Sequence, residues 1–294
     1  MSLAPEDVRR FGSSDAAAML RLDPYRSPLD VYLRWMHGTE QPDEPWMAAG
    51  REAEATVIAR FGRRRGLSMV TGLPVLRCEI NGVPIRAQCD SEAAGDGGVL
   101  IGEAKAPTQF VHPWEWSEAL PPIHWRAQVI HQMGVRWFMG YSVIGAWIVA
   151  EWGYHEGQRR EWFVPWDDAA RTEWAYLLSV YKTAHVEWTE PDDDGKTYPP
   201  EPRDPKEAAR LALAVYPREI DALEEATSDE ITLMRDGIAL RDTASACEAA
   251  WKAQQDRLRA AIGKRAGIRS GGLKATWKAN AKGSRVLLLT GKGE

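Results

Sequence analysis

The chain has 294 residues, 44% of them hydrophobic, and a formal net charge of −5. This length suits one large domain or a domain with an appended lobe, and the apolar content is sufficient for a real core. Three scattered cysteines exclude a disulfide framework and a clustered zinc or iron–sulfur site, and no long apolar run or leader indicates a membrane span or secretion signal. We therefore expect a soluble, cytoplasmic protein.

The charge is unevenly distributed along the chain. From Lys252 to the end there are eleven basic residues against two acidic ones, a local excess of +9 that leaves −14 on the rest. Nucleic-acid binding is therefore compatible with the negative total, because the basic tail and the Arg63-Arg64-Arg65 run can contact phosphates. Both basic stretches can equally be solvated surface.

The first third of the sequence is predicted to be helical. Ser13-Ser14-Asp15 is a cap before a short helix over 16–20, and Ser27-Pro28 opens another over 29–36. A longer helix spans 46–65 and stops at a glycine.

Strands follow and then alternate with helices. Residues 74–80 and 83–90 read as strands joined by Asn81-Gly82, which is a strong hairpin signal, and a third strand ends at Lys105. The remaining elements are predicted in chain order as a helix over 123–137, strands over 141–152 and 158–165, and a helix over 167–188. Together they predict a mixed α/β (α+β) fold with a central sheet flanked by helices.

Proline, aspartate and glycine are concentrated between residues 190 and 205. Such a composition is typical of a linker. We therefore predict a first domain over 1–190, a linker over 191–205 and a helical C-terminal extension over 206–294. The extension is expected to hold helices over 206–215 and 228–263, which could pair with one another, and a small terminal β-hairpin within 273–289.

Three charged residues carry most of the functional information: Asp90, at the end of the strand predicted over 83–90, and Glu103 with Lys105. Residues spaced by two in a strand point to the same face, so Glu103 and Lys105 are expected side by side. Two carboxylates and a lysine can hold a hard divalent cation and steer or deprotonate a water. The pattern alone is also compatible with a surface ion pair.

Two further residues flank this trio on the predicted helices. Glu54 lies on the helix before the sheet, where it could complete a cation site, and Gln128 lies one turn into the helix after it. An amide there can donate and accept near a phosphate or a water. Each residue alone is more often an ordinary surface residue.

The order Glu54, Asp90, Glu103-x-Lys105, Gln128 on helix, strand, strand and helix resembles the PD-(D/E)xK nuclease superfamily, with its restriction-endonuclease-like core. It is most similar to the YqaJ-like, lambda-exonuclease-type phage recombination nucleases. The resemblance spans roughly residues 7–190 and includes these segments: Gly12-Ser-Ser-Asp15, Asp23-Pro-Tyr-Arg-Ser-Pro-Leu29, Gly50-x-x-x-Glu54 and Gln128-x-x-His-Gln-Met133.

The resemblance implies a role for each residue of the site. Asp90, Glu103 and the backbone carbonyl of Ala104 would bind Mg²⁺, with Mn²⁺ as a substitute, and Lys105 would orient or activate the attacking water. Glu54 would serve a second metal or its water shell, and Gln128 would reach the phosphate near the scissile bond.

The resemblance also implies DNA contacts. Arg10 and Ser14 are the nearest counterparts of the family's 5′-phosphate-binding arginine and serine, although Arg9 and Ser13 adjoin them. Trp114 and Trp116 could meet DNA, or could simply pack beneath a loop. The family's proline before the first acid is replaced by Cys89, and the residue before that by Gln88, which puts the family's phosphate pocket in doubt.

The implied function is Mg²⁺-dependent, ATP-independent 5′-to-3′ digestion of double-stranded DNA ends. The resulting 3′ strands would pass to a single-strand annealing protein of phage-type recombination, in a phage or prophage protein that forms a homo-oligomer such as a ring-shaped trimer. A structure-selective or restriction-type endonuclease, or a non-catalytic DNA-end-binding recombination scaffold, are the alternatives. The sequence leaves open the polarity, processivity, preferred end, oligomeric state, annealing partner and role of the extension.

Overall fold

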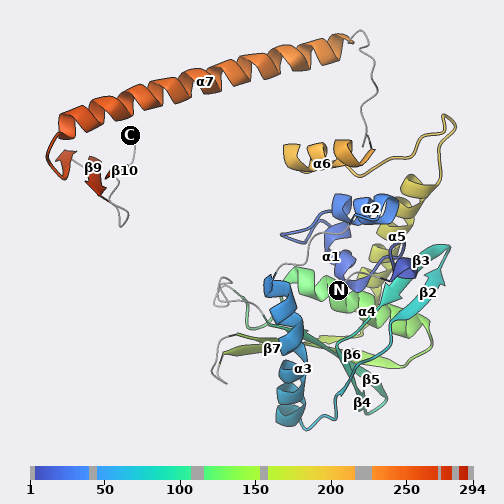
Figure 1. The fold of residues 1–294 in the computed structure, drawn as a ribbon. Helices are drawn as coiled ribbons and strands as arrows, with labels where there is room; N and C mark the ends of the chain where they lie inside the picture. Colours follow the sequence, from blue (N-terminus) through green and yellow to red (C-terminus); the bar gives the residue numbers. More distant parts are fainter. Residues whose placement is uncertain are drawn as a thin grey trace. The chain divides into compact units, whose positions relative to one another are not determined.

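A computed structural model gives the architecture of the chain (Figure 1). It describes residues 4–39, 45–106, 116–152, 158–215, 227–270, 273–279 and 285–290. The helices are α1 (Ala16–Met19), α2 (Pro28–His37), α3 (Pro45–Arg65), α4 (Ile123–Phe138), α5 (Asp168–Thr189), α6 (Pro205–Val215) and α7 (Ser228–Ile262). The strands are β1 (Val70–Thr71), β2 (Leu76–Ile80), β3 (Val83–Ala87), β4 (Ser91–Gly95), β5 (Gly98–Lys105), β6 (Val143–Glu151), β7 (Arg159–Pro165), β8 (Gly267–Ser270), β9 (Leu273–Ala279) and β10 (Arg285–Thr290).

A five-stranded mixed sheet, in the order β1-β4-β5-β6-β7, forms the centre of the fold (Figure 1). Strands β5 and β6 run parallel, with Glu103 opposite Ile148, and the other neighbouring pairs are antiparallel. A parallel pair needs a long crossover, which here contains α4. The predicted mixed α/β class, with a mixed central sheet flanked by helices, is confirmed.

Helices cover both faces of this sheet. Ala104 of β5 packs with Val57 and Phe61 of α3, whereas Ile101 belongs to the larger core built with α4, α5 and the N-terminal helices. Because a strand alternates its faces, Glu103 shares the α4 side of β5 with Ile101. The sheet thus buries Glu103 to 2% exposure in a position that faces a helix rather than solvent.

The segment before β5 differs from the prediction of one strand over 83–90. Strand β3 ends at Ala87 and pairs with β2 in a separate two-stranded sheet, and β4 joins the central sheet instead. The sequence of β4, Ser-Glu-Ala-Ala-Gly, has low strand propensity, so its pairing with β5 and not its composition makes it a strand. Asp90 therefore lies directly before β4 and not at the end of β3.

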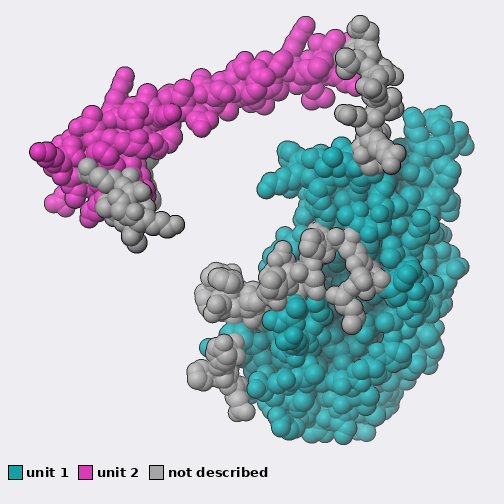
Figure 2. Space-filling view, in the orientation of Figure 1, with its two compact units in different colours: residues 1–219 teal, residues 220–294 magenta. Residues whose placement is uncertain are grey.

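Two compact units divide the chain at residues 219 and 220 (Figure 2). The predicted boundary within 191–205 differs from this division, because α6 packs on α2 and Arg210 of α6 forms an ion pair with Asp30 of α2 at 2.7 Å. Residues 205–215 thus belong with the first unit. The second unit contains α7 and a three-stranded antiparallel sheet in the order β10-β9-β8, which includes the predicted terminal hairpin.

No helix in the described part of the chain combines the length and the apolar character that crossing a bilayer requires.

Candidate active site

The C-terminal end of β5 brings Glu103 and Lys105 together on one face. The Lys105 Nζ donates to Glu103 Oε1 at 2.6 Å, so the two side chains lie side by side as the strand alternation predicts. The Glu103 side chain is almost fully buried, whereas that of Lys105 is 20% exposed. The ammonium group is therefore anchored to a buried carboxylate, while part of the lysine side chain stays exposed.

Asp90 meets the same strand end from the segment before β4. Its Oδ2 accepts a hydrogen bond from the Ala104 backbone N–H at 2.8 Å. The adjoining β4–β5 pair is tightly packed at Gly102, where a Cβ would lie 2.3 Å from Ser91 Oγ. A glycine is required for this approach, which in turn brings Asp90 beside the Glu103–Lys105 pair.

Helix α4 supplies two glutamines to this site. Gln128 accepts from Lys105 Nζ at 2.9 Å and donates to Glu103 Oε1 at 2.6 Å. Gln132, one helical turn later and fully buried, donates to Glu103 Oε2 at 2.7 Å and to the Gln88 carbonyl at 3.0 Å. Both oxygens of Glu103 are therefore held by amide groups on one helix face.

Sequence reasoning gave Gln132 no role, although it stands within the Gln128-x-x-His-Gln-Met133 segment. The i, i+4 spacing of two amides beside a buried carboxylate was the available signal. Gln132 is a positioning residue in this geometry, because it contacts Glu103 and the backbone leading to Asp90.

Glu54 of α3 interacts electrostatically with Glu103 and Lys105. Burial raises the pKa of Glu54, and the nearby Glu103 carboxylate raises it further. Burial together with the carboxylates of Glu103 and Glu54 likewise raises the pKa of Asp90 well above its ordinary value. We call Glu54, Asp90, Glu103 and Lys105 the carboxylate–lysine cluster.

Lys105 is the cation of this cluster. Burial alone would lower the pKa of Lys105, but the carboxylates of Glu103, Asp90 and Glu54 raise it above its usual value. The ammonium form is therefore stabilised near neutral pH. One lysine still faces three carboxylates, so the cluster carries excess negative potential that an additional cation would offset.

The donor set of the cluster fits Mg²⁺. Among the described residues, no three His, Cys, Asp or Glu side chains are grouped closely enough to hold a metal ion by themselves. Magnesium does not need such a cage, because it commonly binds through one or two carboxylates and keeps several waters. Asp90 and Glu103 could provide these carboxylates.

Arg10 and Ser14 lie in an N-terminal segment that runs beside β3. Phe11 exchanges backbone hydrogen bonds with Pro84 and Arg86, so this segment adjoins the strand that leads to Asp90. The Arg10 side chain donates to the backbone carbonyls of Glu6 and Cys78, and the exposed Ser14 accepts through its carbonyl from Arg26.

A buried carboxylate and several guanidinium groups hold this segment in place. Asp15 binds Arg34 at 2.7 Å and Arg26 at 2.9 Å. Burial would raise the pKa of Asp15, but these arginines keep it well below its usual range. The Asp15 carboxylate also accepts from Gly12 N–H, which fixes the turn before α1.

Arg86 adds a third guanidinium to this group, and sequence reasoning missed it. A Cβ on Gly12 would lie 2.9 Å from Arg86 Nη2, and the buried Arg86 Nε has no hydrogen-bond partner among the described residues. Burial lowers the pKa of Arg86, as expected for a cation without full compensation. An arginine within an otherwise apolar strand, four residues before Asp90, was the available signal.

Of the two tryptophans predicted to contact DNA, one lies within the described residues. Trp114 lies outside the described residues. Trp116 packs edge-on against Trp125 and Trp152, with ring centroids 4.8 Å and 5.4 Å apart. Its half-buried position in this aromatic group favours packing over base stacking.

The basic run at the end of α3 is also engaged. Arg64 forms ion pairs with Glu151 and Glu161 at 2.8 Å, and Arg65 pairs with Glu161 and covers the ring of Trp147. Both guanidinium groups thus tie α3 to β6 and β7. Phosphate binding by these two side chains would have to compete with those contacts.

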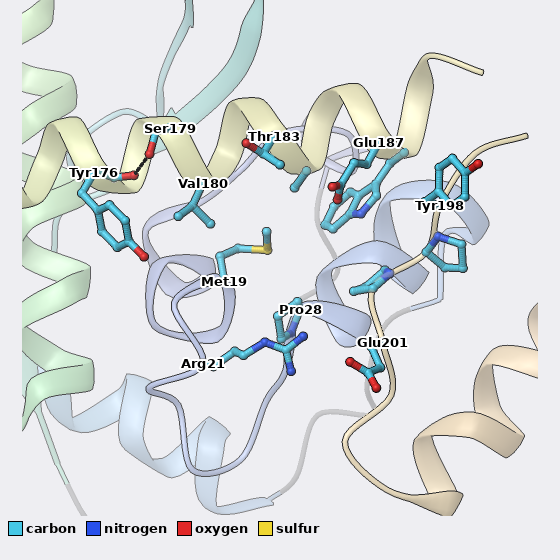
Figure 3. A pocket seen from close by; sticks show the side chains of 14 residues that line it. Met19, Arg21, Pro28, Tyr176, Ser179, Val180, Thr183, Glu187, Tyr198 and Glu201 are labelled. Atoms are coloured by element: carbon cyan, nitrogen blue, oxygen red, sulfur yellow. Dashed lines mark hydrogen bonds between the residues drawn. The ribbon is translucent and has the colours of Figure 1, made fainter. Parts of the chain in front are cut away.

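A groove of about 630 Å³ lies elsewhere on the first unit, between α5 and the chain around residues 198–201 (Figure 3). Met19 and Arg21 line one side of it, and Tyr176 and Glu187 of α5 line another. None of its lining residues belongs to the carboxylate–lysine cluster. The groove is therefore not part of the candidate active site.

Comparisons with known proteins add a family match. Residues 7–140 match the family described as the YqaJ-like viral recombinase domain, and no curated protein sequence matches the chain. Among solved structures, the chain is similar to an alkaline exonuclease (LHK-Exo) from Laribacter hongkongensis, at 18% identity and a TM-score of 0.46 over 70% of this chain and 96% of that one. A phage related exonuclease from Haemophilus somnus 129PT is similar at 13% identity and a TM-score of 0.42, over 59% and 92% of the two chains. The family match covers the whole carboxylate–lysine cluster and Gln128.

Proposed function

The chain carries a YqaJ-like viral recombinase domain over residues 7–140, and from this premise we propose that it is a Mg²⁺-dependent DNA exonuclease. The observation that carries the proposal is the contact of Lys105 with both Glu103 and Gln128, at 2.6 Å and 2.9 Å, beside the Asp90 carboxylate. Hydrolysis of a phosphodiester needs a positioned water and compensation of negative charge on the phosphate. The cluster contains groups suited to both tasks.

Each side chain has a distinct task in this proposal. Asp90 and Glu103 would hold Mg²⁺, with Ala104 lending its carbonyl and Glu54 acting on the water shell. The bound cation would offset the charge that develops on the phosphate oxygens. Lys105, whose ammonium is fixed by Glu103 and Gln128, would orient the attacking water with its one remaining hydrogen.

Gln128 would help to place the DNA. Its amide already bridges Lys105 and Glu103, and an amide has both donor and acceptor groups for a phosphate oxygen or a water. Gln132 would keep Glu103 in its orientation, in the manner of the outer partners that orient metal-binding carboxylates.

We further propose that digestion starts at a 5′-phosphorylated duplex end and proceeds 5′ to 3′. Support comes from the guanidinium groups of Arg26, Arg34 and Arg86, which gather around the buried Asp15 carboxylate in the segment that carries the exposed Ser14. Guanidinium groups are well suited to phosphate. Arg86, in β3, precedes Asp90 by only four residues in the sequence, which would link an end-binding site with the cleavage site.

The 3′-ended single strand that this digestion leaves would then be the substrate of a single-strand annealing protein, as in phage-type recombination. A homo-oligomer such as a trimer is part of the same proposal. An endonuclease with this cluster, and a DNA-end-binding scaffold without hydrolysis, are the competing possibilities that an experiment has to separate.

The test uses linear duplex DNA labelled at the 5′ or the 3′ ends, with and without a 5′ phosphate, and Mg²⁺ followed by EDTA. Early release of 5′ label as mononucleotide, arrested by EDTA, is the expected result. Lys105→Ala should lower the rate by about 10²–10⁴-fold with DNA binding retained. Lys182→Ala, an exposed lysine on α5, is the matched control.

Other outcomes point elsewhere. Internal fragments would indicate an endonuclease, early release of 3′ label would overturn the polarity, and binding without hydrolysis by the unaltered protein would favour the scaffold. Arg86→Ala should reduce the preference for phosphorylated over hydroxyl ends, and an unchanged preference would remove Arg86 from the end-binding site.

A further inference from the structure

Helix α7 carries a long row of apolar side chains that no other described element of the second unit covers. It is 35 residues long, and residues 228–254 are all exposed in the structure. Leu233 and Leu240 are each 71% exposed, and Trp251 is 45% exposed. A helix of this length is expected to bury an apolar stripe against something, because exposed side chains of this size add little stability by themselves.

The stripe has the spacing of a two-stranded coiled coil. Positions alternately four and three residues apart follow one face of α7 over most of its length. They are Leu233, Gly237, Leu240, Ala244, Cys247, Trp251, Gln254 and Leu258. Ile231 and Ile238, each two residues before a seam leucine, lie on the opposite face of the helix, and Leu258 is half-buried near the small sheet.

We propose that α7 pairs with α7 of a second copy of this chain as an antiparallel coiled coil. In the register that overlaps the helices nearly end to end, Leu240 meets Trp251 of the second copy and Leu233 meets Leu258. Ala244 likewise meets Cys247, and Gly237 meets Gln254. Layers of large side chains thus alternate with layers of smaller ones along the seam.

The charges beside the seam select the same register. Asp236 then faces Arg257 of the second copy, and Arg241 faces Glu248, so every charged flanking pair joins opposite signs. Two-fold symmetry repeats each pair. Among the described residues Arg241 pairs with the neighbouring Asp242, and both of these side chains are largely exposed, so the guanidinium group can also reach a partner.

A parallel arrangement fits less well. It would place the two bulky Trp251 side chains against each other in one layer, whereas the antiparallel register pairs each of them with a Leu240. It would also leave Glu248 and Arg257 without charged partners across the seam. The charge pattern beside the seam therefore favours the antiparallel orientation.

A cysteine moved along the seam tests the pairing in the full chain. One chain carries Ala244→Cys with Cys247→Ala, and a second chain of different tag length keeps the native Cys247. When the two are co-expressed and mildly oxidised, a disulfide should join the different chains, because antiparallel pairing brings these two positions together. Its yield should exceed that of either chain alone by about tenfold, as expected for groups held at high effective concentration.

The controls separate the alternatives. A chain with only Cys247→Ala measures background from the half-buried Cys78 and the buried Cys89. Cross-linking of the native chain through Cys247 alone would mean parallel pairing, and absence of any cross-link above background would mean that another surface covers the stripe. Either result overturns the proposal.

Charge reversal supplies a second measurement on the same cross-link. Glu248→Arg or Arg241→Glu in both chains should lower the yield severalfold, because like charges then face each other. The double variant should restore it. Circular dichroism verifies that helix content is unchanged, and failure of the double variant to recover would contradict the assigned register. Nuclease activity plays no part in this readout.

Discussion

The two units of this chain use charged and apolar side chains in opposite ways. In the first unit, Glu103 and Asp15 are almost fully buried, and residues from distant parts of the sequence satisfy them. In the second unit, α7 leaves Leu240 and Trp251 exposed, and its described ion pairs join residues within four positions of each other. Long-range contacts hold the candidate active site in place, whereas α7 depends on local helix formation and, in our proposal, on a second copy.

Truncating one tryptophan in each unit should expose this difference most strongly. Trp188 is 1% exposed and packs on Phe11, Tyr32 and Trp35, so Trp188→Ala is expected to lower the free energy of unfolding of the first unit by about 3–5 kcal/mol. Trp251→Ala should change it by less than about 0.5 kcal/mol and act on self-association instead. Urea unfolding measures both, and equal losses would contradict the comparison.

A glutamine in each unit gives the next contrast. Gln132→Ala removes an amide that holds Glu103. We expect this change to raise the Mg²⁺ concentration needed for half-maximal rate of the proposed nuclease by about 10–100-fold. Gln255→Ala on α7 removes only a contact with Arg259 and should have no such effect. The readout is the Mg²⁺ concentration for half-maximal rate. A fall in maximal rate with this concentration unchanged would show that Gln132 does not position a metal-binding carboxylate.

The pH dependence of stability should also distinguish the first unit. Burial lowers the pKa of His131 from 6.5 to about 4, and its ring lies between the Tyr181 hydroxyl and the Arg86 carbonyl, with Asp15 and the Arg86 guanidinium nearby. The folded protein thus keeps the ring neutral while the unfolded chain takes up a proton. The stabilisation is complete above pH 6.5, is lost as the pH falls toward 4, and amounts to a loss of about 2 kcal/mol at pH 5.

His131→Gln provides the comparison for that measurement. This variant should show a shallower loss of stability between pH 7 and pH 5 than the unaltered chain, whatever its absolute stability. Guanidinium unfolding at the two pH values is sufficient. Parallel slopes for the two proteins would indicate that other groups dominate this range.

The smallest expected effect comes from the helix caps. Asp167 accepts from Ala170 N–H at the start of α5, and Thr227 accepts from Glu230 N–H at the start of α7. Replacing either with Ala should cost about 1 kcal/mol. Loss of the Asp167 cap should lower the stability of the whole first unit, whereas loss of the Thr227 cap should only fray the first turns of α7. Hydrogen exchange distinguishes local fraying from global loss.

Periodicity and turn chemistry were sufficient to predict most of the elements. Asn81-Gly82 predicts the hairpin that joins β2 and β3, and the apolar spacing after Pro121-Pro122 predicts α4. Strand β4 escaped prediction because Ser91–Gly95 has the composition of a loop, and α6 was assigned to the extension because its contacts with α2 leave no local signal. Pairing and packing decided these two.

The sequence by itself determined which residues could form a site: Asp90, Glu103 and Lys105 follow from residue type and strand alternation, and Glu54 and Gln128 from their order. Only the tertiary structure decided what completes it. Gln132 and Arg86 gain their importance from contacts across the fold, since a buried carboxylate or guanidinium must find compensation from whatever packs beside it. Local propensity is written in neighbouring residues, whereas compensation of buried charge depends on which distant segments the fold brings together.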